Sequence, residues 1–127
     1  MFFIAACFGI GCEYNPYVQG ERLYEIHCSN CHMSDGVGLG SLYPPLNGAV
    51  YRERYAADLA CIVRYGLSDS ILIDIQTYDT PMEGIPKLSP AEIANIYNFI
   101  AHSWHQDLRI TTEQEIELKL KKCPGTR

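Results

Sequence analysis

Apolar side chains recur every three or four residues in four segments of the chain, the spacing that gathers them on one face of a helix. The clearest case is the segment 90–103, in which Ile93, Ile96 and Ile100 form one apolar stripe. The pattern predicts helices over 17–29, 55–65, 90–103 and a short stretch that follows residue 112.

Local signals mark where two of these helices begin. Ser89 is followed three residues later by Glu92, which is a capping box, and Pro90 occupies the first helical position between them. Thr112 and Glu115 form a second capping box. These signals predict defined N-termini for the last long helix and for a short C-terminal helix.

The segments between the helices are rich in glycine and proline or follow a different period. Residues 34–50 contain four glycines and two prolines, which predicts a loop. Ile71, Ile73 and Ile75 alternate with other residues, which predicts a short strand-like excursion. Because no repeat or second domain is visible, we expect an all-α chain with three core helices and a short C-terminal helix.

The composition is that of an ordinary globular domain. The 127 residues are 47% hydrophobic and 20% charged, which rules out disordered and collagen-like chains and suits a single domain. The net charge is −5, from 10 basic and 15 acidic residues. A nucleic-acid-binding protein usually has the opposite balance, so we expect no nucleic-acid partner.

Cys28, Cys31 and His32 form the pattern C-x-x-C-H, the signature of covalent c-type haem attachment. Two thiols three residues apart on one turn can each form a thioether with a vinyl group of the same porphyrin. His32 then directs its imidazole at the iron as the proximal ligand. The motif predicts one covalently bound haem c with its iron.

Two other interpretations of paired cysteines fit the chain less well. A structural zinc site needs four ligands, usually with a second Cys or His pair, but His102 and His105 have no cysteine pair beside them. A thioredoxin-type redox pair belongs in a βαβ setting, which the pattern of this chain lacks.

The sixth iron ligand is predicted by elimination. Met1 lies in an apolar N-terminal run, and Met33 adjoins His32 and cannot reach the opposite face of the haem. Met82 remains, in a loop stiffened by Pro81 before the last core helix. With His32 and Met82 as axial ligands, no coordination position is left for oxygen or peroxide, so electron transfer is favoured over catalysis.

With these features the chain resembles a small monohaem class I cytochrome c, from about Gly20 to Trp104. The likeness is carried by Gly20, Tyr24 and Cys28, spaced four residues apart. It implies the cytochrome c fold, in which the glycine lets the first helix cross closely over the last. Tyr97 stands where the family carries its last-helix aromatic, so the resemblance places Gly20 and Tyr24 against Tyr97.

Residues 44–48 resemble the P-x-L-x-G stretch of the same family. The likeness implies that the carbonyl of Pro44 accepts the Nδ1–H of His32, with Pro45 as the alternative register. That bond would leave Nε2 free for the iron. Three arginines could neutralise haem propionates or could be ordinary surface residues: Arg52, Arg54 and Arg64.

The first eleven residues are uncharged and mostly apolar but too short to span a bilayer. We interpret them as the end of a signal sequence, with a short buried strand as the alternative. Cys7 follows a small-residue box of the lipoprotein type, and Cys12 closes the apolar run. We therefore expect a periplasmic protein anchored to a membrane by a lipid at Cys12 or Cys7. The predicted parts are a signal-like segment 1–12, a cytochrome domain 13–109 and a helical extension 110–127.

Cys61 and Cys123 remain after the other cysteines are assigned. In an exported chain an even pair favours a disulfide, which would tie the C-terminal helix to the middle helix. Two separate buried thiols are the alternative.

The resulting hypothesis is a one-electron carrier of a bacterial respiratory chain. Its expected partners are a quinol-oxidising complex or dehydrogenase and a terminal oxidase, with no small-molecule substrate. The acidic charge favours a basic or largely apolar partner surface. The alternative is a fixed haem subunit of a membrane respiratory complex, and a haem enzyme or gas sensor with a displaceable Met82 is a third hypothesis.

Overall fold

The computed structural model describes residues 16–124. The predicted signal-like segment 1–12, with Cys7 and Cys12, lies outside this part of the chain. The elements are α1 (Val18–His27), α2 (Ser29–His32), α3 (Leu59–Tyr65), β1 (Gly66–Leu67), β2 (Ile71–Ile73), β3 (Gln76–Tyr78), β4 (Met82–Glu83), α4 (Pro90–Trp104) and α5 (Glu113–Leu120).

The four predicted helical segments are confirmed, with differences at their ends. The first is divided at Cys28, where α1 ends and the single turn of α2 begins. The second begins earlier than predicted, because a π-helical turn (Tyr51–Tyr55) and a 3-10 turn (Ala56–Asp58) lead into α3. Gly66, with φ 83°, ends α3 as expected.

Both capping boxes are present. Ser89 accepts a hydrogen bond from the backbone N–H of Glu92, and the Glu92 side chain accepts one from the backbone of Ser89. Thr112 and Glu115 make the same reciprocal pair at the start of α5. These bonds satisfy backbone donors that the first turn of a helix leaves unpaired.

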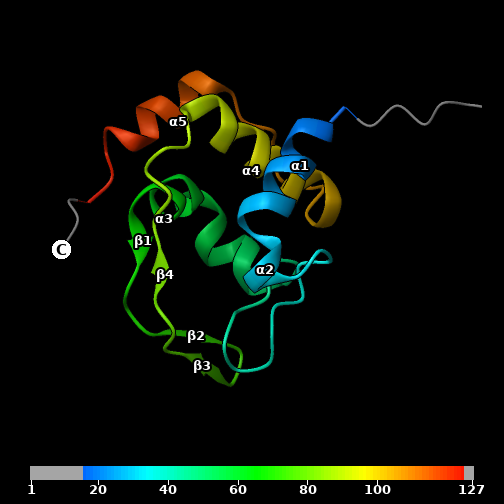
Figure 1. Ribbon diagram of the computed structural model, residues 1–127, viewed down its shortest axis with the longest axis vertical. Helices are drawn as coiled ribbons and strands as arrows, with labels where there is room; N and C mark the ends of the chain where they lie inside the picture. Colours follow the sequence, from blue (N-terminus) through cyan, green and yellow to red (C-terminus); the bar gives the residue numbers. More distant parts are fainter. Residues whose placement is uncertain (1–15, 125–127) are drawn as a thin grey trace, which may run out of the picture.

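Helices α1 and α4 cross at close range, on the right of the bundle in Figure 1. A Cβ on Gly20 would overlap the carbonyl group of Asn95 and lie 2.8 Å from the Cβ of Phe99. The crossing therefore requires glycine. The fully buried ring of Tyr24 packs on Phe99, with ring centroids 5.3 Å apart.

The expectation that Tyr97 meets α1 at this crossing is wrong. Asn95 and Phe99 are one turn apart on α4, so they share the face that meets α1. Tyr97 is only half-buried, and burial together with nearby Glu115 raises its pKa, while Arg109 opposes the rise. The ring of Tyr97 thus lies on the side of α4 near α5.

The strand-like excursion is a short hairpin. Strands β2 and β3 pair antiparallel through Ile71 and Tyr78, and the turn contains Asp74 and Ile75. A second antiparallel ladder joins β1 to β4, with Leu67 opposite Met82. In Figure 1 the β2–β3 hairpin forms the end of the molecule farthest from α5.

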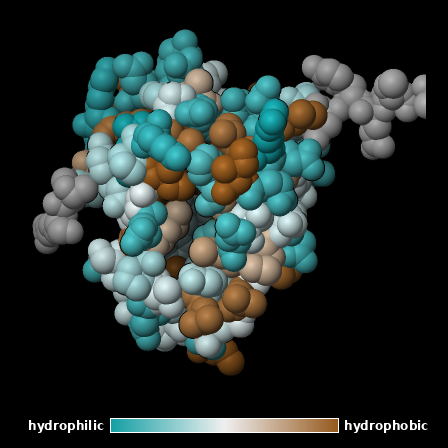
Figure 2. Space-filling view, viewed as in Figure 1, coloured by the Kyte–Doolittle hydropathy of each residue, from teal (hydrophilic) through white to brown (hydrophobic). Residues whose placement is uncertain are grey.

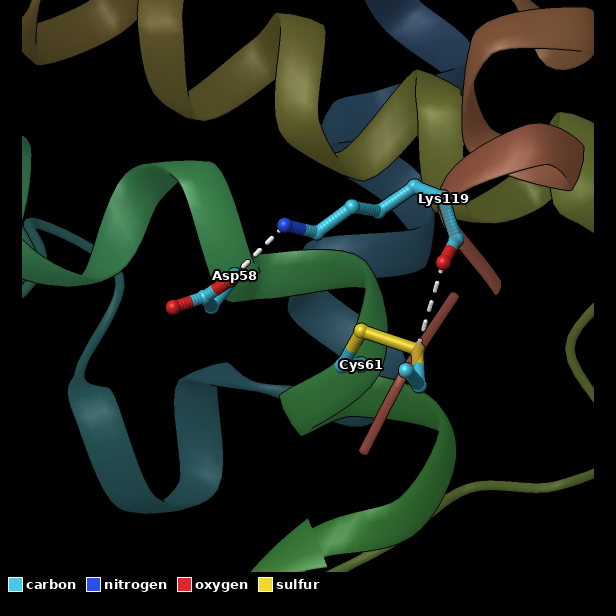
Figure 3. The surroundings of a disulfide bond; sticks show 4 residues. Asp58, Cys61 and Lys119 are labelled. Atoms are coloured by element: carbon cyan, nitrogen blue, oxygen red, sulfur yellow. Dashed lines mark hydrogen bonds and ion pairs between the residues drawn. A yellow bond between two sulfur atoms is a disulfide. The ribbon is translucent and has the colours of Figure 1, made fainter. Parts of the chain in front are cut away.

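A disulfide joins Cys61 of α3 to Cys123, just beyond α5, with Cα atoms 5.6 Å apart. The predicted pairing of these two cysteines is confirmed. Figure 3 shows this bond beside a second link between the same elements, an ion pair of 2.8 Å between Lys119 and Asp58. Ile116 of α5 is buried in the common core, so the extension packs as part of the domain.

We expect the double variant Cys61→Ala/Cys123→Ala to be much less stable than the parent holoprotein. Opening a loop of 62 residues restores chain entropy to the unfolded state, about 4 kcal/mol in the loop-closure estimate. Guanidinium unfolding measures the difference. The control is Asp58→Asn, which removes only the exposed ion pair and should cost less than about 1 kcal/mol. Equal loss in the two variants would contradict a stapling role.

Candidate haem site

The Cys28–His32 segment forms one tight turn at the end of α1. The backbone N–H groups of Cys31 and His32 both donate to the carbonyl of Cys28, at 3.2 and 2.9 Å. Residues three and four apart on such a turn share a face, so both thiols and the imidazole project to the same side. Cys28 and His32 are buried and Cys31 is half-buried.

The chain changes direction directly after His32. Met33 has φ 63°, a left-handed conformation that is uncommon outside glycine. The hydroxyl of Tyr24 donates to the carbonyl of Met33 at 2.7 Å and so holds this bend from inside the core. Sequence reasoning assigned Tyr24 only to the helix crossing and missed this hydrogen bond, which no local pattern announces.

His32 is oriented by the loop that follows it. Its Nδ1–H donates to the carbonyl of Pro44 at 2.9 Å, so the structure has the Pro44 register and not that of Pro45. The loop closes at Gly38, whose N–H donates to the carbonyl of His32 at 3.0 Å. A Cβ on Gly38 would overlap the carbonyl oxygen of Tyr43, so only glycine allows this approach.

Burial lowers the pKa of His32, opposed by its hydrogen bond to Pro44. The imidazole is therefore neutral near pH 7, and Nε2 keeps a lone pair. Burial also raises the pKa of the Cys28 thiol to about 12, with nearby Cys31 adding to the rise. A thiol held so firmly in its protonated form is unlike the low-pKa cysteine of a thioredoxin-type pair.

Met82 is placed by a close approach of two backbone segments. A Cβ on Gly66 would overlap the carbonyl oxygen of Met82, and one on Gly84 would lie 2.6 Å from the carbonyl oxygen of Arg64. Two glycines thus allow β4 to run against the end of α3. The N–H of Ile85 also donates to the carbonyl of Val63 at 2.7 Å.

These segments enclose a cavity of about 510 Å³. Figure 2 shows it as a hollow in the face of the molecule. All the residues predicted for the site line it: Cys28, Cys31, His32, Pro44 and Met82. The rest of the wall is largely apolar and includes Leu59, Ile62, Ile73 and Ile100.

The cavity wall contains a polar atom that the protein leaves unpaired. The hydroxyl of Tyr51 is buried and has no hydrogen-bond partner within residues 16–124. Burial raises the pKa of Tyr51, so its proton is available for donation. A porphyrin with carboxylate side chains fits this wall, because it would fill the apolar space and supply the missing acceptor.

The three arginines suggested for the propionates do not line the cavity. Arg52 forms ion pairs with Asp107 and Glu53, each at 3.2 Å. Arg64 donates to the carbonyl of Leu88 at 2.7 Å. Arg54 is exposed and is not part of the wall.

His105 contributes to the site in a way that sequence reasoning missed. This residue follows α4 and is 5% exposed. Its Nε2 lies 2.7 Å from the carbonyl of Leu46, and its ring stacks on that of Tyr51 with centroids 5.4 Å apart. His105 therefore ties the loop after His32 to α4 and supports Tyr51 from behind.

A metal site built from protein ligands alone is absent from the described residues, where no three His, Cys, Asp or Glu side chains gather. The zinc alternative has no support in this part of the chain. Among residues 16–124, no helix has the length and apolar character needed to cross a membrane.

The family model for cytochrome c matches residues 17–104. The chain therefore belongs to the cytochrome c family, whose members transfer electrons through covalently attached haem c and its iron, and its fold is the all-α cytochrome c fold.

Named relatives fall into two kinds. Cytochrome c-552 of Thermus thermophilus is 29% identical over 113 residues, which cover 81% of this chain and 86% of that protein. A second cytochrome c-552, from another strain of the same species, is also 29% identical, with 76% of that protein covered. The cytochrome c subunit of a quinone alcohol dehydrogenase from Gluconobacter oxydans is 33% identical over 89 residues, covering 67% of this chain and 18% of that subunit.

The buried hydroxyl gives a test of how the cavity meets its cofactor. Tyr51→Phe should destabilise the holoprotein by about 1–3 kcal/mol, because a bond to a charged acceptor is lost. Guanidinium unfolding of the holoprotein measures this, with the exposed Tyr65→Phe as the control, for which we expect a change within about 0.5 kcal/mol. A Tyr51→Phe protein as stable as its parent would mean that the hydroxyl has no partner.

Proposed function

We propose that this protein is a one-electron carrier in which His32 Nε2 and the sulfur of Met82 are the axial ligands of the haem iron. Cys28 and Cys31 hold the haem through thioethers. The observation that carries the proposal is the shared cavity: the C-x-x-C-H turn lines one part of its wall and Met82, from a segment fifty residues later, lines another.

Bound haem c supplies an iron that takes up and releases one electron. The protein's residues do the rest. The Pro44 carbonyl fixes the tautomer of His32, and the apolar wall limits the access of water. The thioether sulfur of Met82 is a soft ligand that favours ferrous iron and raises the reduction potential. With both axial positions filled by side chains, a substrate has no coordination position.

The setting that we propose is a bacterial respiratory chain. A quinol-oxidising complex or a dehydrogenase would reduce the protein, and a terminal oxidase would oxidise it. The size match with cytochrome c-552 supports a separate small carrier. The relative that is a subunit of a quinone alcohol dehydrogenase favours a second function, that of a fixed haem subunit in a membrane complex.

We further propose that the protein works on the periplasmic side of a membrane, attached by a lipid at Cys12 or Cys7. Support comes from the sequence alone: an uncharged apolar run, a small-residue box before Cys7, and a change to polar residues directly after Cys12.

Replacing Met82 tests the axial ligand. In Met82→Ala the midpoint potential should fall, on the order of 100 mV or more, because the ferrous state loses its soft ligand. The ferrous protein should also bind carbon monoxide at neutral pH. Potentiometry, carbon monoxide difference spectra and haem staining on a denaturing gel measure potential, open coordination and retained covalent haem.

The control for this experiment is Met33→Leu, which changes the methionine beside His32 and should leave the potential within a few tens of millivolts of the parent. Parent protein that binds carbon monoxide as readily as Met82→Ala would refute ligation by Met82.

Membrane fractionation separates the carrier from the complex subunit and tests the anchor. Cells that express the full chain should hold the protein in the membrane fraction, and mild detergent should release it as a species of its own size on gel filtration. Cys12→Ala or Cys7→Ala, whichever removes the lipid, should move it to the soluble periplasmic fraction. Release in one large complex would favour the subunit function, and membrane retention of both variants would contradict the lipid anchor.

A further inference from the structure

The entrance of the haem cavity is bordered by two segments that are distant in sequence. The loop after α2 contributes Tyr43 and Pro44 to the wall, and the β2–β3 hairpin contributes Ile71 and Ile73. In Figure 1 these segments form the end of the molecule opposite α5. Figure 2 shows apolar side chains gathered on this end, below the hollow.

Four exposed apolar side chains project from these two segments, and we call them the apolar rim. Two come from the loop and two from the hairpin: Leu39, Leu42, Leu72 and Ile75. Their exposed fractions lie between 45% and 99%. A partner that reached the cavity from this end would meet them first.

Ile75 is the clearest sign that the rim is not explained by folding. Its side chain is 99% exposed at the turn of the hairpin, so its burial contributes nothing to stability. Tight turns favour glycine, asparagine or aspartate, and a β-branched residue has no conformational advantage there. The preceding Asp74 already supplies the positive φ of the turn, at 54°.

The charges around the rim have one sign. Residues 66–84 contain no lysine or arginine, and residues 34–50 contain only one charged side chain, that of Asp35. The carboxylates of 66–84 are all exposed, and none is ion-paired within residues 16–124: Asp69, Asp74, Asp79 and Glu83. Asp69 and Glu83 also line the cavity, whose wall contains no lysine or arginine.

The basic residues lie elsewhere, and several are already neutralised. Lys119 pairs with Asp58, Arg109 with Glu115 and Lys121 with Glu117. Unpaired negative charge is therefore concentrated around the entrance of the cavity, beside exposed apolar side chains.

We propose that the apolar rim and its carboxylates are the docking surface for a redox protein whose contact face has an apolar centre bordered by lysine or arginine. This inference rests on the proposed electron-carrier function and names the chemistry of its partner. An apolar centre with a polar border is the usual anatomy of a protein interface, and opposite charges at the border accelerate association. A second copy of this chain or an anionic membrane would be repelled.

A small oxidant with both properties of the partner provides the first test. Tris(1,10-phenanthroline)cobalt(III) carries three positive charges on apolar ligands, and ferricyanide carries three negative charges. In each reaction the ferrous holoprotein loses one electron, which reduces cobalt(III) to cobalt(II) or ferricyanide to ferrocyanide. Stopped-flow absorbance at several ionic strengths gives both rate constants.

Between about 10 and 200 mM salt we expect the rate with the cobalt complex to fall about fivefold or more, and the rate with ferricyanide to rise. The reverse salt dependence, or none, would overturn the proposal. Failure of both reagents to oxidise the protein would instead refute the electron-carrier function itself.

Matched variants locate the effect on the surface. Asp74→Asn/Asp79→Asn and Ile75→Ser change the border and the rim without touching the cavity wall. Glu113→Gln and Leu118→Ser make the equivalent changes on exposed positions of α5. The first two should each slow the cobalt reaction about twofold or more, and the α5 variants should leave it unchanged. Equal effects at both sites would show that only net charge matters and would overturn the assignment of this surface.

Paramagnetic mapping checks the location directly. The redox-inert analogue tris(1,10-phenanthroline)chromium(III) broadens the amide resonances of residues that it contacts. We expect selective broadening over 39–42 and 72–79 in the ferrous holoprotein, weakened in Ile75→Ser. Broadening centred on α5 instead would overturn the proposal.

Discussion

The contact of α1 with α4 at Gly20 is the constraint on which the rest of the structure depends. With no Cβ at this position, the backbone of α1 meets the carbonyl of Asn95 directly. Tyr24, one turn later, is then fully buried and its hydroxyl reaches the carbonyl of Met33. The turn that carries both thiols and the imidazole therefore stands in a fixed relation to α4, on whose far end the loop after His32 is also tied.

The opposite part of the cavity depends on a second close approach, that of Gly66 and Gly84. These residues let β4 run against the end of α3, so Met82 is held by backbone packing and not by its own side chain. Each proposed axial ligand thus sits next to a backbone contact that only glycine permits. A ligand set held in this way changes little between two oxidation states, which suits electron transfer.

Much of this organisation could be predicted from the sequence because its signals are local. The C-x-x-C-H spacing, the two capping boxes and Gly66 as a helix end each depend on residues within one turn of one another. Tyr97 was wrong because helical periodicity shows which residues share a face, whereas the facing helix decides which face it meets. Tyr51 and His105 could not be predicted, since an unpaired hydroxyl and a bond to the Leu46 carbonyl exist only once distant segments meet.

The disulfide between Cys61 and Cys123 has a topological consequence. It closes a covalent ring that contains α3, both strand ladders, α4 and α5, and therefore the whole Met82 side of the cavity. The Cys28–His32 turn lies outside that ring. Thioethers at Cys28 and Cys31 would fasten the cofactor to the open part of the chain alone. The sulfur of Met82 would then be the one ligand that links the ringed half of the protein to the half that carries the haem.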